Sequence, residues 1–297
     1  MDGPLVSVGL QFFNNEKTLP LAIASILNQS YQNLELILHN DGSSDRSLDI
    51  ARSFSDPRIR LFTDDANRKR PQRLNSSLGL AQGKYYAIMD GDDIAYPDRI
   101  MKQVEYLEIH PSVDLVGAGM LVFGKGGEAI GKRQPPLTHA EIVAAPGAGF
   151  PLAQPTFMGK LDWFRKYGYD VRALGGVEDQ DLLLRSYQTS IFANLPDILM
   201  GYQEPALSLK KIIFARYAFG KSLIRCCSSR SNGVWLARSL AVQLIRAGTD
   251  AIAIGTGLKY RLLRHRANPL NSDEHEEWRQ IYGAVVRSAS FTYSQNF

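Results

Sequence analysis

Short apolar segments alternate with helical patterns along the first 90 residues of this chain. The apolar segments have the length and composition of buried strands, and they lie at 5–10, 34–38, 59–62 and 85–89. Apolar residues with helical spacing fill the intervals, at 18–28, 45–54 and 73–81. Strands that alternate with helices of this length predict a parallel sheet wound by right-handed crossovers. The sequence therefore predicts an α/β fold, whose ligands would bind beyond the carboxyl ends of the strands.

Three carboxylates in four residues follow the last of these strands, in the tetrapeptide Asp90-Gly91-Asp92-Asp93. Like charges this close repel one another unless a cation lies between them. A divalent ion bound by carboxylate oxygens is the natural counter-charge, and such ions often carry the phosphates of a substrate. A solvated Asp/Gly turn is the alternative. A second acidic turn, at 40–45, follows the 34–38 strand, so we expect both turns at one edge of the sheet.

The order and spacing of several segments resemble family 2 of the inverting, nucleotide-sugar-dependent glycosyltransferases, which have the GT-A fold. The resemblance spans roughly residues 4 to 205. The matching segments are 6–8, 13–15, 40–45, Asn75 with 79–83, 90–93 with 97–99, 110–111 and 178–185. It implies a Rossmann-like, mostly parallel sheet flanked by helices. It also implies transfer of a sugar, in a hexosyltransferase-like reaction, from a nucleotide donor that we expect to be a UDP-sugar.

The resemblance implies roles for residues that would bind the donor. Phe13 would stack on the base, Asp41 would bind the base or the ribose, and Asp90 would face the ribose. Asp92 would bind the metal ion, Mn²⁺ or Mg²⁺, that bridges the diphosphate. The basic cluster at 68–70, with Arg73, precedes the 85–89 strand. From this cluster we expect Lys69 and Arg73 to reach the nucleotide or its phosphates, and a solvated basic loop is the alternative.

The attacking hydroxyl group of the acceptor needs a base, and Glu178 with Asp179 is the candidate pair. Acidic residues at the start of a helix usually serve only as partners of the helix dipole. Gly175 and Gly176 precede the pair, however, and suggest a loop that an acceptor can approach closely. The resemblance implies that Asp179 is the general base. Attack on the face opposite the diphosphate would then invert the anomeric centre.

The chain departs from the family pattern at two places. Gln11-Phe12-Phe13 stands where the family often has Pro-Thr-Tyr, so the ring at position 13 lacks a hydroxyl group. Gln154 stands where many relatives have a histidine before Pro-Thr. Because glutamine cannot ionise and is a poorer ligand, the departure puts a metal or phosphate role for this position in question.

The sequence suggests three regions. Residues 1–99 would form the nucleotide-sugar-binding half and 100–205 the acceptor half of one GT-A catalytic domain, and 206–297 would form a basic helical extension. In the acceptor half we expect separate sheet elements at 113–118 and 119–124, and an acceptor channel lined by 146–155. Four aromatic residues could form a sugar platform or pack in the core. They are Trp163, Phe164, Tyr167 and Tyr169.

Charge is distributed unevenly along the chain. Residues 1–205 hold 20 Lys and Arg against 25 Asp and Glu, whereas 206–297 hold 14 against 5. Basic residues interleaved with Leu, Ile, Phe and Trp suit an anionic membrane surface, and an ordinary helical cap with a solvated basic face is the alternative. The densest basic run is 260–266. No nucleic-acid-binding motif accompanies the charge, so we expect no nucleic-acid partner.

The remaining features bound location and activity. The first strand starts near the first residue, no apolar stretch reaches about 18 residues, and the two cysteines are adjacent. We therefore expect a cytoplasmic protein, peripheral at the inner face of a membrane, that glycosylates a hydroxyl group of a glycan or a lipid-linked acceptor. Two alternatives remain: a metal-dependent nucleotidyltransferase, or a nucleotide-sugar-binding protein without turnover.

Overall fold

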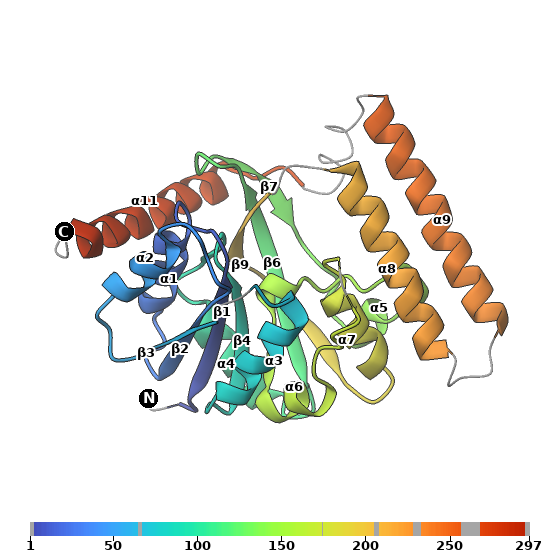
Figure 1. The fold of residues 1–297 in the computed structure, drawn as a ribbon, viewed down its shortest axis with the longest axis horizontal. Helices are drawn as coiled ribbons and strands as arrows, with labels where there is room; N and C mark the ends of the chain where they lie inside the picture. Colours follow the sequence, from blue (N-terminus) through green and yellow to red (C-terminus); the bar gives the residue numbers. More distant parts are fainter. Residues whose placement is uncertain are drawn as a thin grey trace.

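A computed structural model describes residues 3–64, 67–173, 175–204, 208–227, 233–256 and 268–294. Within these residues nine strands form one sheet in the order β3-β2-β1-β4-β8-β6-β9-β5, with β7 paired to β6 (Figure 1). The strands are β1 (Val6–Phe12), β2 (Leu34–Asn40), β3 (Ile59–Thr63), β4 (Tyr85–Asp90), β5 (Ile94–Ala95), β6 (Leu115–Phe123), β7 (Ala129–Arg133), β8 (Met158–Lys160) and β9 (Phe192–Gln203).

The four strands that the sequence predicts in the first 90 residues are present and parallel. β1 lies between β2 and β4, and β3 pairs with β2. The second half of the sheet is mixed: β8 is antiparallel to both β4 and β6, whereas β9 is parallel to β6. The predicted α/β fold with a mostly parallel sheet is therefore confirmed. The carboxyl ends of β1, β2 and β4 meet at one edge of the sheet.

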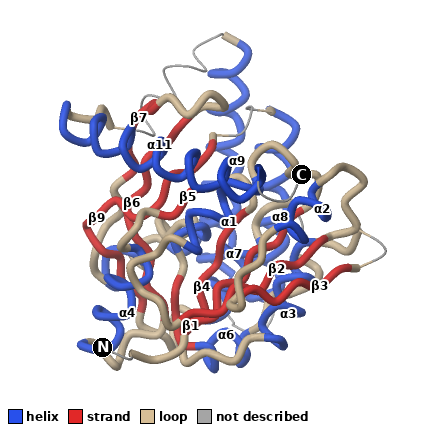
Figure 2. Tube along the Cα trace, turned by 90° about the vertical axis from the view of Figure 1, so that its left-hand side faces the viewer, coloured by secondary structure: helices blue, strands red, loops and turns tan. Residues whose placement is uncertain are grey.

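Helices cover both faces of the sheet because successive side chains of a strand point to opposite faces. Ala87 and Met89 of β4 pack in the core beneath α1, α2 and α4, whereas Tyr86 and Ile88 pack beneath α3, α6 and α7. Figure 2 shows the strands running through the molecule with helices around them. The elements up to residue 204 are α1 (Leu19–Leu27), α2 (Ser47–Ser53), α3 (Arg70–Leu80), α4 (Arg99–Ile109), α5 (His139–Ile142), α6 (Leu161–Tyr167), α7 (Glu178–Ser186) and the 3₁₀ turns η1 (Pro146–Ala148) and η2 (Gln154–Thr156).

Two predicted boundaries are wrong. α3 begins at Arg70, before the first periodic apolar residue, because Pro71 fits the first turn of a helix. The elements expected at 113–118 and 119–124 are one continuous strand, β6. Gly117 lies within this strand and leaves room for the side chain of Asn194 on β9. A Cβ atom at Gly117 would lie 2.3 Å from Oδ1 of Asn194.

The four aromatic residues proposed as a sugar platform are mostly core residues. Trp163, Phe164 and Tyr169 are buried, and Tyr167 packs against the same cluster. The rings of Trp163, Phe164 and Tyr167 pack edge-on or tilted against one another, and that of Phe164 packs against Tyr86. The core alternative is therefore the correct one for these residues.

The C-terminal region divides into two parts on opposite sides of the molecule (Figure 1). α8 (Leu209–Cys227) and α9 (Gly233–Gly255) lie side by side, and α8 packs against α7. α9 continues through Gly248 without a break. α11 (Ser272–Ser294) packs against α1. The basic run at 260–266 lies outside the described residues. Of the helices in the described parts of the chain, none combines the length and apolarity needed to cross a membrane.

Trp278 attaches α11 to the sheet. Its side chain is buried, stacks on Tyr96, packs against Phe123, and donates a hydrogen bond from Nε1 to the carbonyl oxygen of Gly127 at 2.8 Å. Gly201 of β9 leaves room for the ring, since a Cβ atom there would lie 2.4 Å from it. The Trp278 side chain thus joins α11 to β6, to β9 and to the residue that follows β5.

We predict that Trp278→Ala lowers the free energy of unfolding by about 3–5 kcal/mol, because it leaves a large cavity beneath α11. Urea denaturation followed by circular dichroism measures the change. Tyr217→Ala on α8 is the matched control, since that ring is 58% exposed and its loss should cost about 1 kcal/mol or less. Equal losses in the two variants would show that Trp278 does not anchor α11.

Candidate active site at the carboxyl edge of the sheet

A cavity of about 420 Å³ lies at the carboxyl ends of β1, β2 and β4. Polar and charged side chains from five separate segments reach it, which is the arrangement expected of a ligand site in an α/β sheet. The lining residues are Gln11, Phe12, Phe13, Asn15, Asp41, Arg70, Arg73, Asp90, Gly91, Asp92, Tyr202 and Gln203. Five of the six side chains predicted to bind the donor are among them. The sixth, Lys69, is exposed and does not line the cavity.

Asp41 and Arg73 form an ion pair at one end of the cavity. Asp41 also accepts a hydrogen bond from the backbone N–H of Arg68 at 2.8 Å. The Arg73 side chain is buried, yet Nε and Nη1 have no hydrogen-bond partner among the described residues. Unpaired buried donors are costly. A ligand with acceptor oxygen atoms would satisfy them.

The three carboxylates of the acidic turn differ in environment. Asp90 and Asp92 line the cavity, whereas Asp93 is fully buried and accepts a hydrogen bond from the N–H of Gln203 at 3.0 Å. Burial and the neighbouring charge of Asp90 raise the pKa of Asp92 to about 6. Burial, with the charges of Asp90 and Asp92, also raises the pKa of Asp93 well above its usual value. The turn therefore holds more negative charge than its surroundings neutralise.

This excess of negative charge fits a divalent cation at Asp92. No group of three or more His, Cys, Asp and Glu side chains in the described parts of the chain is arranged to hold a metal ion alone. Mg²⁺ commonly uses one or two carboxylates and completes its coordination with water and substrate phosphates. An ion held here would therefore need the phosphates of a ligand as well as Asp92.

Arg70, which the sequence analysis did not select, lies at the centre of the site. Its Nη2 donates to Oδ1 and Oδ2 of Asp90 at 2.7 and 2.9 Å and to Oε1 of Gln154 at 3.1 Å. Its Nε contacts Oε1 of Glu178 at 3.0 Å. The sequence shows four basic residues close together but not which one faces inward. The inward direction of the Arg70 side chain depends on the start of α3 at this residue.

The first turn of α7 carries the predicted base. Glu178 is 2% exposed and pairs with Arg70. Asp179 lines a second cavity, of about 470 Å³, together with Gln180 and with residues 150–153 of the predicted acceptor channel. Burial raises the pKa of both carboxyl groups. A carboxylate with a raised pKa is a better proton acceptor, as a general base requires.

Gln180 connects the predicted base to the acceptor loop. Its Oε1 accepts the N–H of Phe150 at 2.7 Å, and its Nε2 donates to the carbonyl oxygen of Phe150 and to Oδ2 of Asp179, both at 3.3 Å. The sequence contains Gln180 but no signal for this role, because the contact joins segments 30 residues apart. Asp179 is thus oriented by the same side chain that fixes the loop.

Both glycines before α7 have left-handed backbone conformations. Gly175 and Gly176 have φ angles of 89° and 75°, a region that other residues rarely adopt. A Cβ atom at Gly175 would also lie 2.7 Å from the ring of Phe214 on α8. The loop therefore requires glycine for both backbone conformation and space.

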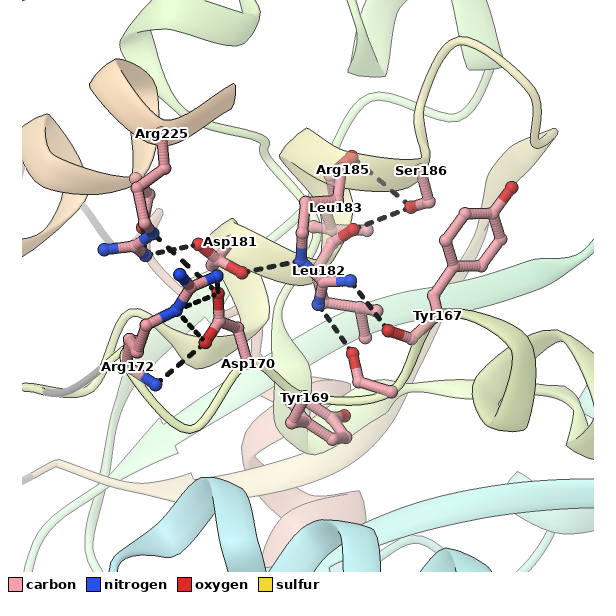
Figure 3. Close-up of polar contacts among 12 residues, drawn as sticks. Tyr167, Tyr169, Asp170, Arg172, Asp181, Leu182, Leu183, Arg185, Ser186 and Arg225 are labelled. Carbon is pink, nitrogen blue, oxygen red and sulfur yellow. Dashed lines mark hydrogen bonds and ion pairs between the residues drawn. The ribbon is translucent and has the colours of Figure 1, made fainter. Parts of the chain in front are cut away.

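α7 is held from behind by an ion network with α8 (Figure 3). Asp181 is buried, and it accepts hydrogen bonds from Arg185 and from Arg225 of α8, both at 2.8 Å. Arg225 also lies 3.8 Å from Asp170, which pairs with Arg172 at 2.7 Å. Arg185 in turn donates to the carbonyl oxygens of Tyr167 and Gly168 (Figure 3). The helix that bears Glu178 and Asp179 is therefore tied to the C-terminal region.

Comparison with known protein sequences identifies relatives along most of the chain. The family described as "Glycosyl transferase family 2" matches residues 7–168. EpsE of Bacillus subtilis (strain 168) is 34% identical over 276 residues, which cover 89% of this chain and 96% of EpsE. The matched segments include both acidic turns and the basic cluster.

Two solved structures are similar in fold. The crystal structure of S. aureus TarS 1–349 in complex with UDP-GlcNAc has a TM-score of 0.64 and 16% identity, and covers 96% of this chain and 81% of that chain. The mannosyltransferase PcManGT from Pyrobaculum calidifontis, in complex with GDP-Man and Mn²⁺, has a TM-score of 0.58 and 16% identity, and covers 99% and 88%. At this identity the likeness shows the fold alone, and it confirms the predicted GT-A fold.

We predict that Arg225→Gln lowers the free energy of unfolding by about 1–3 kcal/mol, because buried Asp181 would keep only Arg185 as its ion partner. Chemical denaturation measures the change. Arg279→Gln is the control: its pair with Glu276 is exposed and should contribute about 0.5 kcal/mol or less. A value for Arg225→Gln as small as the control would show that α8 does not hold α7 through this network.

Proposed function

The chain belongs to glycosyl transferase family 2 and is a nucleotide-sugar glycosyltransferase, and from that membership we propose its reaction. It transfers a hexose-like sugar from a UDP-sugar to a hydroxyl group of a glycan or lipid-linked acceptor, with inversion of the anomeric centre. The single observation that carries the proposal is the placement of Arg70 between Asp90 of the donor cavity and Glu178, the neighbour of Asp179. Donor-binding acids and a candidate base thus belong to one connected site.

The donor binds in the first cavity in this proposal. Asp41 would accept a hydrogen bond from the N3–H of uracil, and the unpaired nitrogen atoms of Arg73 would donate to its carbonyl oxygens. Phe13, whose side chain is 42% exposed at the cavity, would stack on the base. Asp90 would face the ribose. Lys69 remains a candidate for the phosphates through movement of its exposed side chain.

Asp92 would hold Mn²⁺ or Mg²⁺ together with the diphosphate. A divalent ion bound there would act as a Lewis acid and stabilise the negative charge of the leaving nucleoside diphosphate. The presence of Mn²⁺ in the PcManGT complex supports this choice. Asp93 would contribute indirectly, because it fixes the backbone of Gln203 at the wall of the cavity.

Asp179 would take the proton of the acceptor hydroxyl group. Its position on the second cavity supports this role, and Gln180 would hold its carboxylate toward the acceptor. Glu178 would contribute by fixing Arg70. Attack by the acceptor oxygen opposite the leaving diphosphate inverts the anomeric centre. Because burial raises the pKa of Asp179, activity should be lost as pH falls through that raised value.

The C-terminal region would bring the enzyme to its acceptor. We propose that 1–99 and 100–205 act as donor and acceptor halves and that 206–297 contacts an anionic membrane surface from the cytoplasmic side. Residues 208–256 contain one acidic residue, Asp250, which is buried and pairs with Arg216. Exposed cations and exposed apolar side chains share this region. They are Lys210, Lys211, Ile213, Phe214, Tyr217, Lys221, Ile224, Val234, Arg238, Leu244, Ile245, Arg246 and Ile252.

This surface lies next to the predicted acceptor loop. Gln243 of α9 donates to the carbonyl oxygen of Gly147 at 2.8 Å, and Arg246 donates to that of Ala148. The following residues, Gly149 and Phe150, are the ones that contact Gln180. A membrane bound by α8 and α9 would therefore present a lipid-linked acceptor beside the second cavity.

We predict that Asp179→Asn lowers kcat by about 10²–10⁴-fold and leaves the Kd for UDP within about twofold. Release of UDP from UDP-sugars, with Mn²⁺ and acceptor present, measures turnover, and calorimetry measures binding. Asp162→Asn on α6 is the matched control, since that carboxylate is exposed in the first turn of a helix. Loss of UDP binding together with turnover would mean that Asp179 is structural. No turnover with any nucleotide sugar would refute the proposed reaction.

We predict that the protein sediments with vesicles containing anionic phosphatidylglycerol at low salt and not with neutral vesicles. Each basic residue near such a surface contributes about 1 kcal/mol, so Lys210→Glu with Lys211→Glu should weaken binding by at least about tenfold. Lys17→Glu with Lys125→Glu, at two other exposed lysines, is the charge-matched control. Absence of sedimentation at low salt would eliminate the membrane proposal.

A further inference from the structure

Arg70 connects the donor and acceptor sides of the site. It is the first residue of α3, and its guanidinium group contacts the end of β4 through Asp90, η2 through Gln154 and α7 through Glu178. Asp90 and Glu178 side chains are 18% and 2% exposed, whereas that of Arg70 remains 42% exposed. Three side chains therefore hold the guanidinium group of Arg70, which still lines the cavity.

The surrounding charges make Arg70 the available cation. Five carboxyl groups lie around Arg70: Asp90, Asp92, Asp93, Glu178 and Asp179. The guanidinium group of Arg99 lies behind them, but it is fully buried and bonded to the carbonyl oxygens of Ile88 and Phe157. Arg73 is buried and paired with Asp41. Of the two cations that line this cavity, Arg70 is the one whose charge can meet a ligand's phosphates.

Gln154 supports Arg70 from behind. Its Oε1 accepts from Arg70 at 3.1 Å, while its Nε2 donates to the hydroxyl oxygen of buried Tyr169 at 3.4 Å. Asn75 fixes Tyr169 through two backbone hydrogen bonds of 2.8 Å. A neutral side chain at 154 can accept from a guanidinium group, whereas a cationic one would repel it. Gln154 is therefore matched to an arginine at position 70.

We propose that Arg70 binds the diphosphate of the donor and stabilises it as the leaving group, and that Gln154 positions Arg70 for this task. The inference rests on the proposed function. As the bond from the anomeric carbon to the phosphate oxygen breaks, its electron pair stays on that oxygen, to which Arg70 donates hydrogen bonds. The acceptor oxygen forms the new bond to the anomeric carbon, and its proton passes to Asp179.

A binding experiment with two ligands locates the contact of Arg70. Calorimetry with UDP and with uridine, each in EDTA and in Mn²⁺, compares the wild type with Arg70→Gln and Arg70→Lys. We expect Arg70→Gln to weaken UDP binding about 10–100-fold in EDTA, as for a lost charge-assisted contact, and to leave uridine within about twofold. Arg70→Lys should weaken UDP binding by an intermediate amount, because lysine keeps the positive charge but lacks the planar guanidinium group that can donate two parallel hydrogen bonds.

A matched control and the opposing outcomes make the test decisive. Arg52→Gln on α2 removes an arginine that is 60% exposed, and it should leave the Kd for UDP and for uridine unchanged. If Arg70→Gln weakened the binding of UDP and of uridine equally, Arg70 would only shape the cavity. If UDP binding were unchanged, Arg70 would not touch the diphosphate. Either outcome would overturn this inference and leave the donor assignment intact. A wild type that binds no UDP overturns the donor assignment and this inference with it.

Kinetics test the role of Gln154. We expect Arg70→Gln to lower kcat by about 10²–10³-fold, as for removal of one preorganised donor to a developing anion. Gln154→Leu should lower kcat in the same direction but add little when combined with Arg70→Gln, because it acts through that side chain. If the double variant lost kcat by the product of the two single losses, Gln154 would not act through Arg70. Melting temperatures within a few degrees of the wild type establish that the variants fold.

Discussion

Crowded carboxylates at one edge of the sheet determine the arrangement of the candidate active site. β4 delivers Asp90, and the turn after it delivers Asp92 and Asp93, while the first turn of α7 adds Glu178 and Asp179. Such a set is unfavourable without cations. Arg99 supplies one from the interior and Arg70 another from the cavity side. Gln154, which is bonded to Tyr169, holds that second cation in place.

Much of the fold could be predicted because burial leaves a direct trace in the sequence. Of the four apolar strands before residue 90, β1, β2 and β4 are almost entirely buried, so their composition was sufficient to find them. β3 is only partly buried, but its apolar residues still mark it. Asp41, Asp90 and Asp92 were identified because parallel strands bring their carboxyl ends to one edge. The family model and the relatives confirm the glycosyltransferase assignment. The roles of the individual site residues stay predictions.

The features missed by sequence reasoning depend on contacts between distant segments. Lys69 was preferred to Arg70 because nothing in the sequence fixes which residue of the basic cluster turns inward. The segments 113–118 and 119–124 were interpreted as separate sheet elements, whereas they form one strand in which Gly117 leaves room for the side chain of Asn194 from β9. The link from Gln180 to Phe150 likewise joins the first turn of α7 to a loop that appears unrelated to it in the sequence. Tertiary packing, which carries no local signature, decides each of these cases.

The last described helix lies against the first one. α11 packs on α1, and Asn28 donates a hydrogen bond to the hydroxyl oxygen of Ser288 at 2.8 Å across 260 residues. During synthesis, the face of α1 that α11 covers stays uncovered until residues 272–294 have left the ribosome. Native packing of the N-terminal layer therefore waits for a helix far along the chain, and long-range closure of this kind slows folding.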